Sequence, residues 1–302
     1  MDWKTGALIL SVGMLTLPAT PVLAQNDDRT VRLAPSMPWN LDFSEDSCAL
    51  RRIFGEEGRE VYFELRQYAP GGDLQLSVLT DDIPRRPRDA RITFMPDHSP
   101  IERERWFPVE SENFGEGMLT TIDLSSAYTR YMREQADEEN PFEPPSDAER
   151  DAREAEIEAF RIEGAFRYPI ELQTGSFSNA MNGMRSCMDE LLAHWGIDVE
   201  AHRTLTRKVA PLDQAVWVQE FYPHYPSDMA RRGEQAYIRA RINVSAEGRA
   251  TACNVQSQLN DETFNTLACE LLLEHSRFEP ALDASGDPIA SYHTMSIIYS
   301  LE

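Results

Sequence analysis

The sequence has little positive charge for its length. Its 302 residues include 29 lysines and arginines against 51 aspartates and glutamates, which gives a formal net charge of −22 and a pI of about 4.7. A nucleic-acid-binding protein needs a basic face that neutralises phosphates, and docking on anionic lipids needs clusters of basic residues. The deficit therefore argues against nucleic acid as a partner and against attachment to anionic headgroups.

The common catalytic and metal-binding motifs are also absent from the sequence. It has no GxSxG, no GxxxxGK[ST], no HExxH or HxxxH, no CxxC and no DxDxDG loop. Acidic pairs such as Asp81-Asp82 and Glu138-Glu139 are expected by chance among 51 acidic residues, and none lies in an apolar setting that would tune a pKa. We therefore expect no enzymatic activity, no cofactor and no metal site.

Long hydrophobic runs are missing after the first two dozen residues. Residues 1–24 contain Lys4, an apolar run from Ala7 to Leu17, two prolines and then Val22-Leu23-Ala24, which suits a signal-peptidase site. The apolar run is shorter than the ~20 residues that a spanning helix needs. We expect a cleavable signal peptide over 1–24 and no stable membrane anchor, the alternative being a retained anchor.

Four cysteines are present, and export bears on their state. An even number of cysteines in an exported chain indicates two disulfides, and four cysteines allow three pairings. The two-part layout described below favours Cys48–Cys187 and Cys253–Cys269. The alternative is four buried free thiols.

Periodicity and turn residues predict an α+β protein with a β-rich first domain over 39–203, after a flexible lead-in at 25–38. Residues 39–43 alternate apolar and polar side chains, and two β-rich runs at 60–68 and 74–80 flank a glycine-rich turn, which predicts a hairpin. The role of this domain is not indicated by any motif.

Helices are expected at about 133–195, together with an acidic, proline-containing linker. Ser146 and Glu149 have the spacing of a capping box and predict an exposed helix. Residues 176–195 place methionines, leucines and Cys187 on one helical face, with Ser176 or Ser178 as the cap, and predict a buried helix that closes the first domain.

A linker at 204–215 precedes a smaller domain at 216–302, whose elements follow the order α-β-β-α-β. The elements are a short helix after Tyr225-Pro226 that stops at Gly233, an alternating strand at 234–245, the turn Ala246-Glu247-Gly248-Arg249, a returning strand at 250–259, an amphipathic helix capped by Asn260, the segment Arg277-Phe278-Glu279-Pro280-Ala281 and a last strand at 291–301.

These elements, in this order and spacing, resemble the C-terminal domain of TonB-type proteins. The resemblance implies a three-stranded antiparallel sheet with the last strand at its edge, where an extended segment of a partner adds as a further strand. It implies a periplasmic location and a protein or peptide partner, such as a TonB-dependent outer-membrane transporter. The implied partner-binding residues are Tyr292, His293, Thr294, Met295, Ser296, Ile297, Ile298 and Tyr299, with Gln219, Phe221 and Tyr222 in the far wall of the groove.

The sequence departs from TonB-type energy transducers in two ways. It has an expected cleavable signal in place of a membrane helix, and the cluster from Pro141 to Pro145 is too short for a spacer that crosses the periplasm. Coupling to an inner-membrane motor is therefore not expected. The alternative function is that of a structural, self-assembling protein whose last strand pairs in a homodimer.

Overall fold

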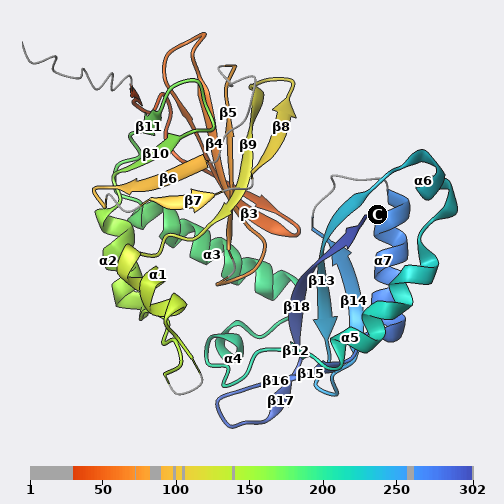
Figure 1. Ribbon diagram of the computed structural model, residues 1–302. Helices are drawn as coiled ribbons and strands as arrows, with labels where there is room; N and C mark the ends of the chain where they lie inside the picture. Colours follow the sequence, from red (N-terminus) through yellow and green to blue (C-terminus); the bar gives the residue numbers. More distant parts are fainter. Residues whose placement is uncertain are drawn as a thin grey trace, which may run out of the picture.

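The computed structural model describes residues 30–71, 73–81, 90–97, 100–103, 106–137, 140–256 and 262–300. The predicted signal peptide and the predicted cap Asn260 lie outside the described residues. Two separate clusters of buried hydrophobic residues form the cores, one from residues 48–197 and one from residues 209–299. Figure 1 shows the corresponding two parts, with α3 below the N-terminal sheets and the C-terminal sheet beside them.

A six-stranded antiparallel sheet forms the larger part of the N-terminal domain. Its strand order is β2-β3-β4-β5-β9-β8, formed by β2 (Asn40–Ser44), β3 (Ser47–Phe54), β4 (Val61–Gln67), β5 (Leu74–Leu79), β9 (Gly115–Ile122) and β8 (Phe107–Ser111). The predicted hairpin is confirmed, since β4 and β5 pair antiparallel with Tyr62 opposite Leu79. One face of the sheet supplies core residues such as Phe63 and Leu76.

A second sheet packs onto the same core and differs from the sequence-based expectation. Its order is β1-β11-β10-β6-β7, formed by β1 (Val31–Leu33), β11 (Ile170–Leu172), β10 (Ala159–Glu163), β6 (Ala90–Met95) and β7 (Ile101–Arg103). Strand β1 lies within the segment expected to be a flexible lead-in, and pairs parallel with β11. Strands β10 and β11 lie in the region that was expected to contain only a linker and helices. They form strands there because their buried residues complete this sheet.

In the described part of the N-terminal domain, four helices accompany these sheets: α1 (Ala127–Glu134), α2 (Asp147–Glu156), α3 (Ser178–His194) and α4 (Val199–Arg203). The capping box of α2 is present, with Ser146 and Glu149 bonded to each other's backbone amides. Helix α3 is the predicted buried helix, but its N-cap is Phe177 and no serine caps it. Phe177 is fully buried among other aromatic rings, so packing fixes this end of the helix.

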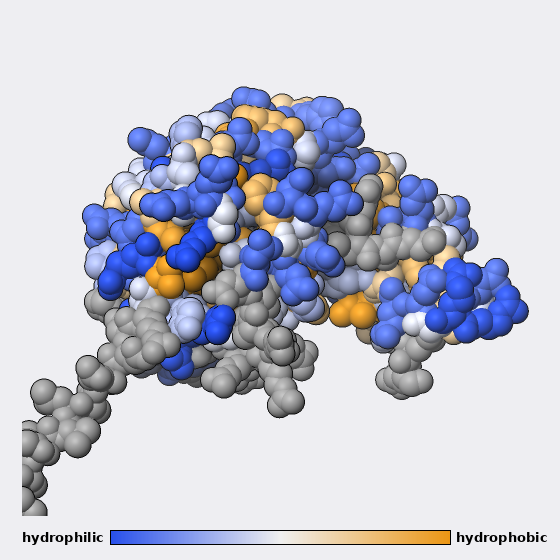
Figure 2. Space-filling model, turned by 90° about the horizontal axis from the view of Figure 1, so that it is seen from above, coloured by the Kyte–Doolittle hydropathy of each residue, from blue (hydrophilic) through white to orange (hydrophobic). Residues whose placement is uncertain are grey.

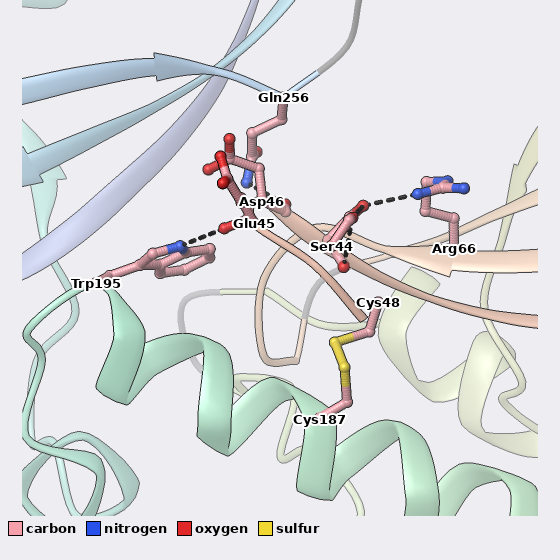
Figure 3. The surroundings of a disulfide bond; sticks show 9 residues. Ser44, Glu45, Asp46, Cys48, Arg66, Cys187, Trp195 and Gln256 are labelled. Atoms are coloured by element: carbon pink, nitrogen blue, oxygen red, sulfur yellow. Dashed lines mark hydrogen bonds between the residues drawn. A yellow bond between two sulfur atoms is a disulfide. The ribbon is translucent and has the colours of Figure 1, made fainter. Parts of the chain in front are cut away.

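Helix α3 is tied covalently to the six-stranded sheet. The Cys48–Cys187 disulfide joins β3 to the buried face of α3, as the sequence predicts (Figure 3). Both cysteines are buried. The methionine-rich face of α3 is core, where each fully buried methionine or leucine contributes about 1.5–3 kcal/mol.

The C-terminal domain has the predicted α-β-β-α-β order around a three-stranded antiparallel sheet, β14-β13-β18. Its elements are α5 (Gln214–Trp217), the 3-10 helix η1 (Val218–His224), α6 (Ser227–Arg232), β13 (Ala236–Val244), β14 (Ala250–Val255), α7 (Glu262–His275) and β18 (Ser291–Tyr299), with the short pairs β12 (Ala210–Pro211)–β15 (Phe278–Glu279) and β16 (Ala281–Leu282)–β17 (Pro288–Ile289). The second predicted disulfide, Cys253–Cys269, joins β14 to α7.

The segment expected to be a linker at 204–215 packs on the C-terminal domain. The amides of Thr206 and Arg207 donate to the carbonyl of Leu282, and Val209 is buried in the C-terminal core. Strand β12 pairs with β15.

The surface reflects the composition of the chain. Figure 2 shows a face on which hydrophilic residues predominate and hydrophobic residues gather in small, separate patches. This pattern agrees with a formal net charge of −22.

Candidate functional site

Strand β18 lies at one edge of the C-terminal sheet. It pairs with β13 over its whole length, from Ser291 opposite Val244 to Tyr299 opposite Ala236. Within the described part of the chain no strand pairs with its other side. An edge of this kind presents a row of unpaired N–H and C=O groups, which an extended chain can satisfy.

The hydrogen bonds of β13 show which backbone groups of β18 face outward. The backbone N–H of Gln256 donates to the backbone carbonyl of Arg239 at 2.8 Å, so Arg239 turns its backbone groups towards β14. Because successive residues of an antiparallel strand bond to opposite sides, Ala240 turns its groups towards β18 and its partner Met295. The backbone groups of Met295 are therefore used within the sheet, and those of its two neighbours point outward.

The same alternation assigns the free edge to four residues of β18. The outward N–H and C=O groups belong to Tyr292, Thr294, Ser296 and Ile298, and the inward groups to the residues between them. Side chains also alternate along a strand. The four residues with outward backbone groups therefore share one face of the sheet, which is the face opposite α7.

The other face of β18 packs into the C-terminal core, so the side chains of four residues that the resemblance implied for partner binding contact the core instead: His293, Met295, Ile297 and Tyr299. Met295 and Ile297 contact the core cluster, and the Tyr299 ring lies 5.1 Å from Phe264 and 5.7 Å from Tyr225 between ring centres. Burial raises the pKa of Tyr299 to about 12. These side chains anchor the strand and leave its outer edge to interact.

His293 lies on the same core face, near the start of β18. Its ring centre is 5.5 Å from that of Phe278. Burial lowers its pKa, and a hydrogen bond with the Val209 backbone opposes that effect. His293 is therefore held neutral by its apolar surroundings, as expected for a structural histidine.

One end of the open face is accessible to solvent. Ile298 is 69% exposed, and Tyr237, opposite it on β13, is 41% exposed. The Tyr237 and Ser296 hydroxyls share a hydrogen bond of 2.8 Å. This end combines outward backbone groups with exposed apolar surface, which is what a bound strand requires.

The other end of the open face is covered by the N-terminal domain. The Tyr292 ring lies 5.4 Å from that of Trp195, in an edge-on contact, and 5.4 Å from that of His202, in a stacked contact. Tyr292 thus packs against the N-terminal core. Burial raises its pKa, although the nearby Arg241 acts in the opposite direction.

The segment that was expected to line the far wall of the groove, Val218–Tyr225, is largely helical. Residues 218–224, with Gln219, Phe221 and Tyr222 among them, form the 3-10 helix η1. Phe221 is buried in the core beside Trp217, at 6.4 Å between ring centres. The spacing of these two aromatic residues is that of one helical face, which turns Phe221 into the core.

A polar cleft of about 640 Å³ lies between the two domains, lined by the outer face of the six-stranded sheet and by the end of β14. Its most buried charge is Glu64, which accepts hydrogen bonds from Arg51, Arg66 and Tyr62 at 2.7, 3.0 and 2.8 Å. Burial alone would raise the pKa of Glu64, but these bonds and the charge of Arg66 lower it. The charges compensate one another, as in a structural network.

The described residues contain no group of three or more His, Cys, Asp or Glu side chains that could hold a metal ion. Among those residues, no helix is both long and apolar enough to cross a membrane.

Residues 222–301 match the family described as Gram-negative bacterial TonB protein C-terminal. The C-terminal domain is a TonB C-terminal domain. The match begins within η1 and includes α6, the three-stranded sheet and α7, and it confirms the resemblance seen in the sequence. Such domains are protein-interaction modules and not enzymes. No curated protein matches the chain.

Three residues that shape this edge were not among those predicted from the sequence. Tyr237 was recognisable from the alternation of β13, which places it on the polar face. Trp195 and His202 were not, because nothing in the local sequence indicates that they contact a strand about 100 residues further along the chain.

Proposed function

We propose that the protein binds an extended segment of a partner protein by strand addition to the free edge of β18. The observation that carries this proposal is the row of outward backbone groups at Thr294, Ser296 and Ile298, next to the exposed face of Tyr237. Backbone hydrogen bonds supply affinity in this mode, and alternate side chains supply specificity.

The partner in this proposal is a segment of an outer-membrane transporter, met in the periplasm. Support comes from the TonB C-terminal family of the domain and from the sequence of residues 1–24, which has the features of a secretory signal. Motor coupling is not part of the proposal, because the sequence after residue 24 offers no long proline-rich spacer.

The test uses residues 25–302 and a transporter-derived extended peptide, followed by NMR. Strand addition predicts shift changes in the amides of 294–299. N-methylation should weaken binding at least about tenfold at alternate peptide positions, because only every second peptide N–H faces β18. Uniform effects of N-methylation would contradict strand addition.

Two variants at Ser296 separate the backbone from the side chain. Ser296→Pro removes an outward N–H and leaves the ladder with β13 intact, a position where edge strands accept proline. Ser296→Ala keeps the N–H and removes the hydroxyl. We expect loss of peptide binding in the first variant and retention in the second; equal binding by both would refute the proposal.

The same pair of variants tests the homodimer alternative. The free edge and the exposed Ile298 are also suited to pairing with β18 of a second copy. Sedimentation of the wild type as a dimer, with a monomer for Ser296→Pro and a dimer for Ser296→Ala, would favour self-pairing over peptide capture.

A further inference from the structure

The N-terminal domain packs across one end of the open face of the C-terminal sheet and contacts β13, β18 and the residue that follows β14. Gln256, next to β14, donates from Nε2 to the backbone carbonyls of Asp46 and Tyr68 at 3.1 and 2.8 Å. Arg241 of β13 bonds Asp46 at 3.0 Å. Tyr292 of β18 packs on Trp195 and His202.

The contacts at Tyr292 occupy space that an added strand would need. In a hydrogen-bonded strand pair, directly opposite residues carry their side chains on the same face, with Cβ atoms about 4.5–5.5 Å apart. A partner residue opposite Tyr292 would therefore place its side chain on the open face. His202 stacks on the Tyr292 ring with an interplanar angle of 17°, and Trp195 contacts the same ring, so that space is already filled.

The order of the contacts places His202 on the outer side of Tyr292. Trp195 lies over both Arg241 of β13 and Tyr292 of β18, so it covers the inner side of Tyr292. The His202 ring lies against Tyr292 from α4, which Figure 1 shows beside the lower part of β18, away from β13. From four residues further along β18, no such cover lies over the open face, since the side chains of Ser296 and Ile298 are both exposed.

We propose that the N-terminal domain terminates the strand-addition site at Tyr292, so that a partner segment pairs only with the part of β18 from Thr294 onward. This inference rests on the proposed function and adds the class of partner that fits. The fitting segment is short, with an apolar side chain opposite Ile298 and a small or polar one opposite Ser296. The N-terminal domain is held in this position because the hydrogen bonds of Arg241, Asp46 and Gln256 join the two domains.

The experiment compares peptides of different length on residues 25–302. A core peptide of about six residues spans ~20 Å as a strand. Two further peptides add about four residues at either its N-terminus or its C-terminus. Fluorescence anisotropy gives their affinities, and NMR shows which amides of β18 respond.

For the wild type we expect neither extension to improve Kd by more than about twofold, and shift changes to stay within 294–299. In His202→Ala, one of the two extended peptides, and not the other, should gain about fivefold or more, with new shift changes at 291–293. His194→Ala is the matched control, because His194 is an exposed histidine near the end of α3. It should behave as the wild type does.

Two results would overturn the inference in different ways. If an extended peptide binds the wild type much more tightly than the core peptide, with shift changes at 291–293, strand addition holds and the stop does not. If none of the three peptides binds, strand addition fails and the stop with it.

Discussion

The guanidinium of Arg241 lies 4.0 Å from the centre of the Trp195 ring and joins the two domains. The same side chain is 5% exposed and bonds the Asp46 carboxylate at 3.0 Å (both Asp46 and Trp195 are labelled in Figure 3). Burial lowers the pKa of Arg241, and the bond to Asp46 opposes this effect. This buried cation contacts the Trp195 ring and the Asp46 carboxylate across the interface and donates to the Asn243 side chain within its own strand, which makes it the polar centre of the interface.

Arg241→Ala should destabilise the protein by about 2–3 kcal/mol, because it removes a desolvated cation–π contact and a charged hydrogen bond. Arg239→Ala is the matched control. Arg239 lies on the same face of β13, 4.9 Å from the Tyr68 ring, but it is less buried, so its loss should cost about 1 kcal/mol or less. Urea unfolding measures both values. Equal effects would contradict the role assigned to Arg241.

Two glycines of the C-terminal domain separate backbone strain from lack of space. Gly248 has φ +75°, and a Cβ there would lie 2.0 Å from the Phe278 carbonyl oxygen. Gly233 has φ +71°, and a Cβ there would meet nothing within 4 Å. Gly233→Ala should therefore cost about 1–2 kcal/mol for the left-handed conformation alone. Gly248→Ala should cost more, about 3 kcal/mol or above, because the backbone must also shift.

Urea unfolding of the two variants checks this difference. A Gly248→Ala variant as stable as Gly233→Ala would show that the turn at 245–249 yields easily, contrary to the close approach seen at Phe278.

Local patterns predicted the elements that bury one face or carry their own cap. The alternation in residues 236–244 predicts β13, and Ser146 with Glu149 predicts the start of α2. The disulfide pairing followed from the two-part layout. The edge position of β18 followed from the resemblance to the TonB C-terminal family, since periodicity alone does not order the strands of a sheet.

Features set by long-range packing could not be predicted in this way. The contacts of Tyr292 join segments about 100 residues apart, and each partner alone resembles an ordinary core or surface residue. Strands β10 and β11 have five and three residues, too few to show a clear alternation of apolar and polar side chains. The helical conformation of Val218–His224 was not predicted either, because it depends on burial of Phe221 in a core formed by distant residues.

The burial of His202 beside Tyr292 predicts that the free energy of unfolding decreases in acid. Burial lowers the pKa of His202 from 6.5, Lys208 lowers it further and Asp189 opposes them. The folded state therefore holds this histidine neutral, whereas the unfolded state takes up a proton near pH 6.5. As the pH falls below about 6.5, the unfolded state binds more protons and the free energy of unfolding decreases, levelling off below the folded-state pKa.

Urea unfolding between pH 7.5 and 5.5 tests this dependence. His202→Phe keeps an aromatic ring beside Tyr292 and cannot titrate, so its stability should fall less steeply with acid than that of the wild type. His194→Phe, at an exposed position, is the control and should keep the wild-type slope. A slope in His202→Phe equal to that of the wild type would contradict the prediction.

The two disulfides should differ in their contribution to stability because they close loops of different length. Cys48–Cys187 spans a sequence separation of 139 residues and Cys253–Cys269 one of 16. The chain-entropy relation gives about 5 kcal/mol for the first and about 3 kcal/mol for the second.

Double alanine variants of each cysteine pair, followed by hydrogen exchange, measure these losses of stability and locate them in the structure. Removing Cys48 and Cys187 should expose amides of β3 and α3, and removing Cys253 and Cys269 those of β14 and α7. A larger loss from the shorter loop would show that packing around the sulfur atoms outweighs the entropy of the unfolded chain.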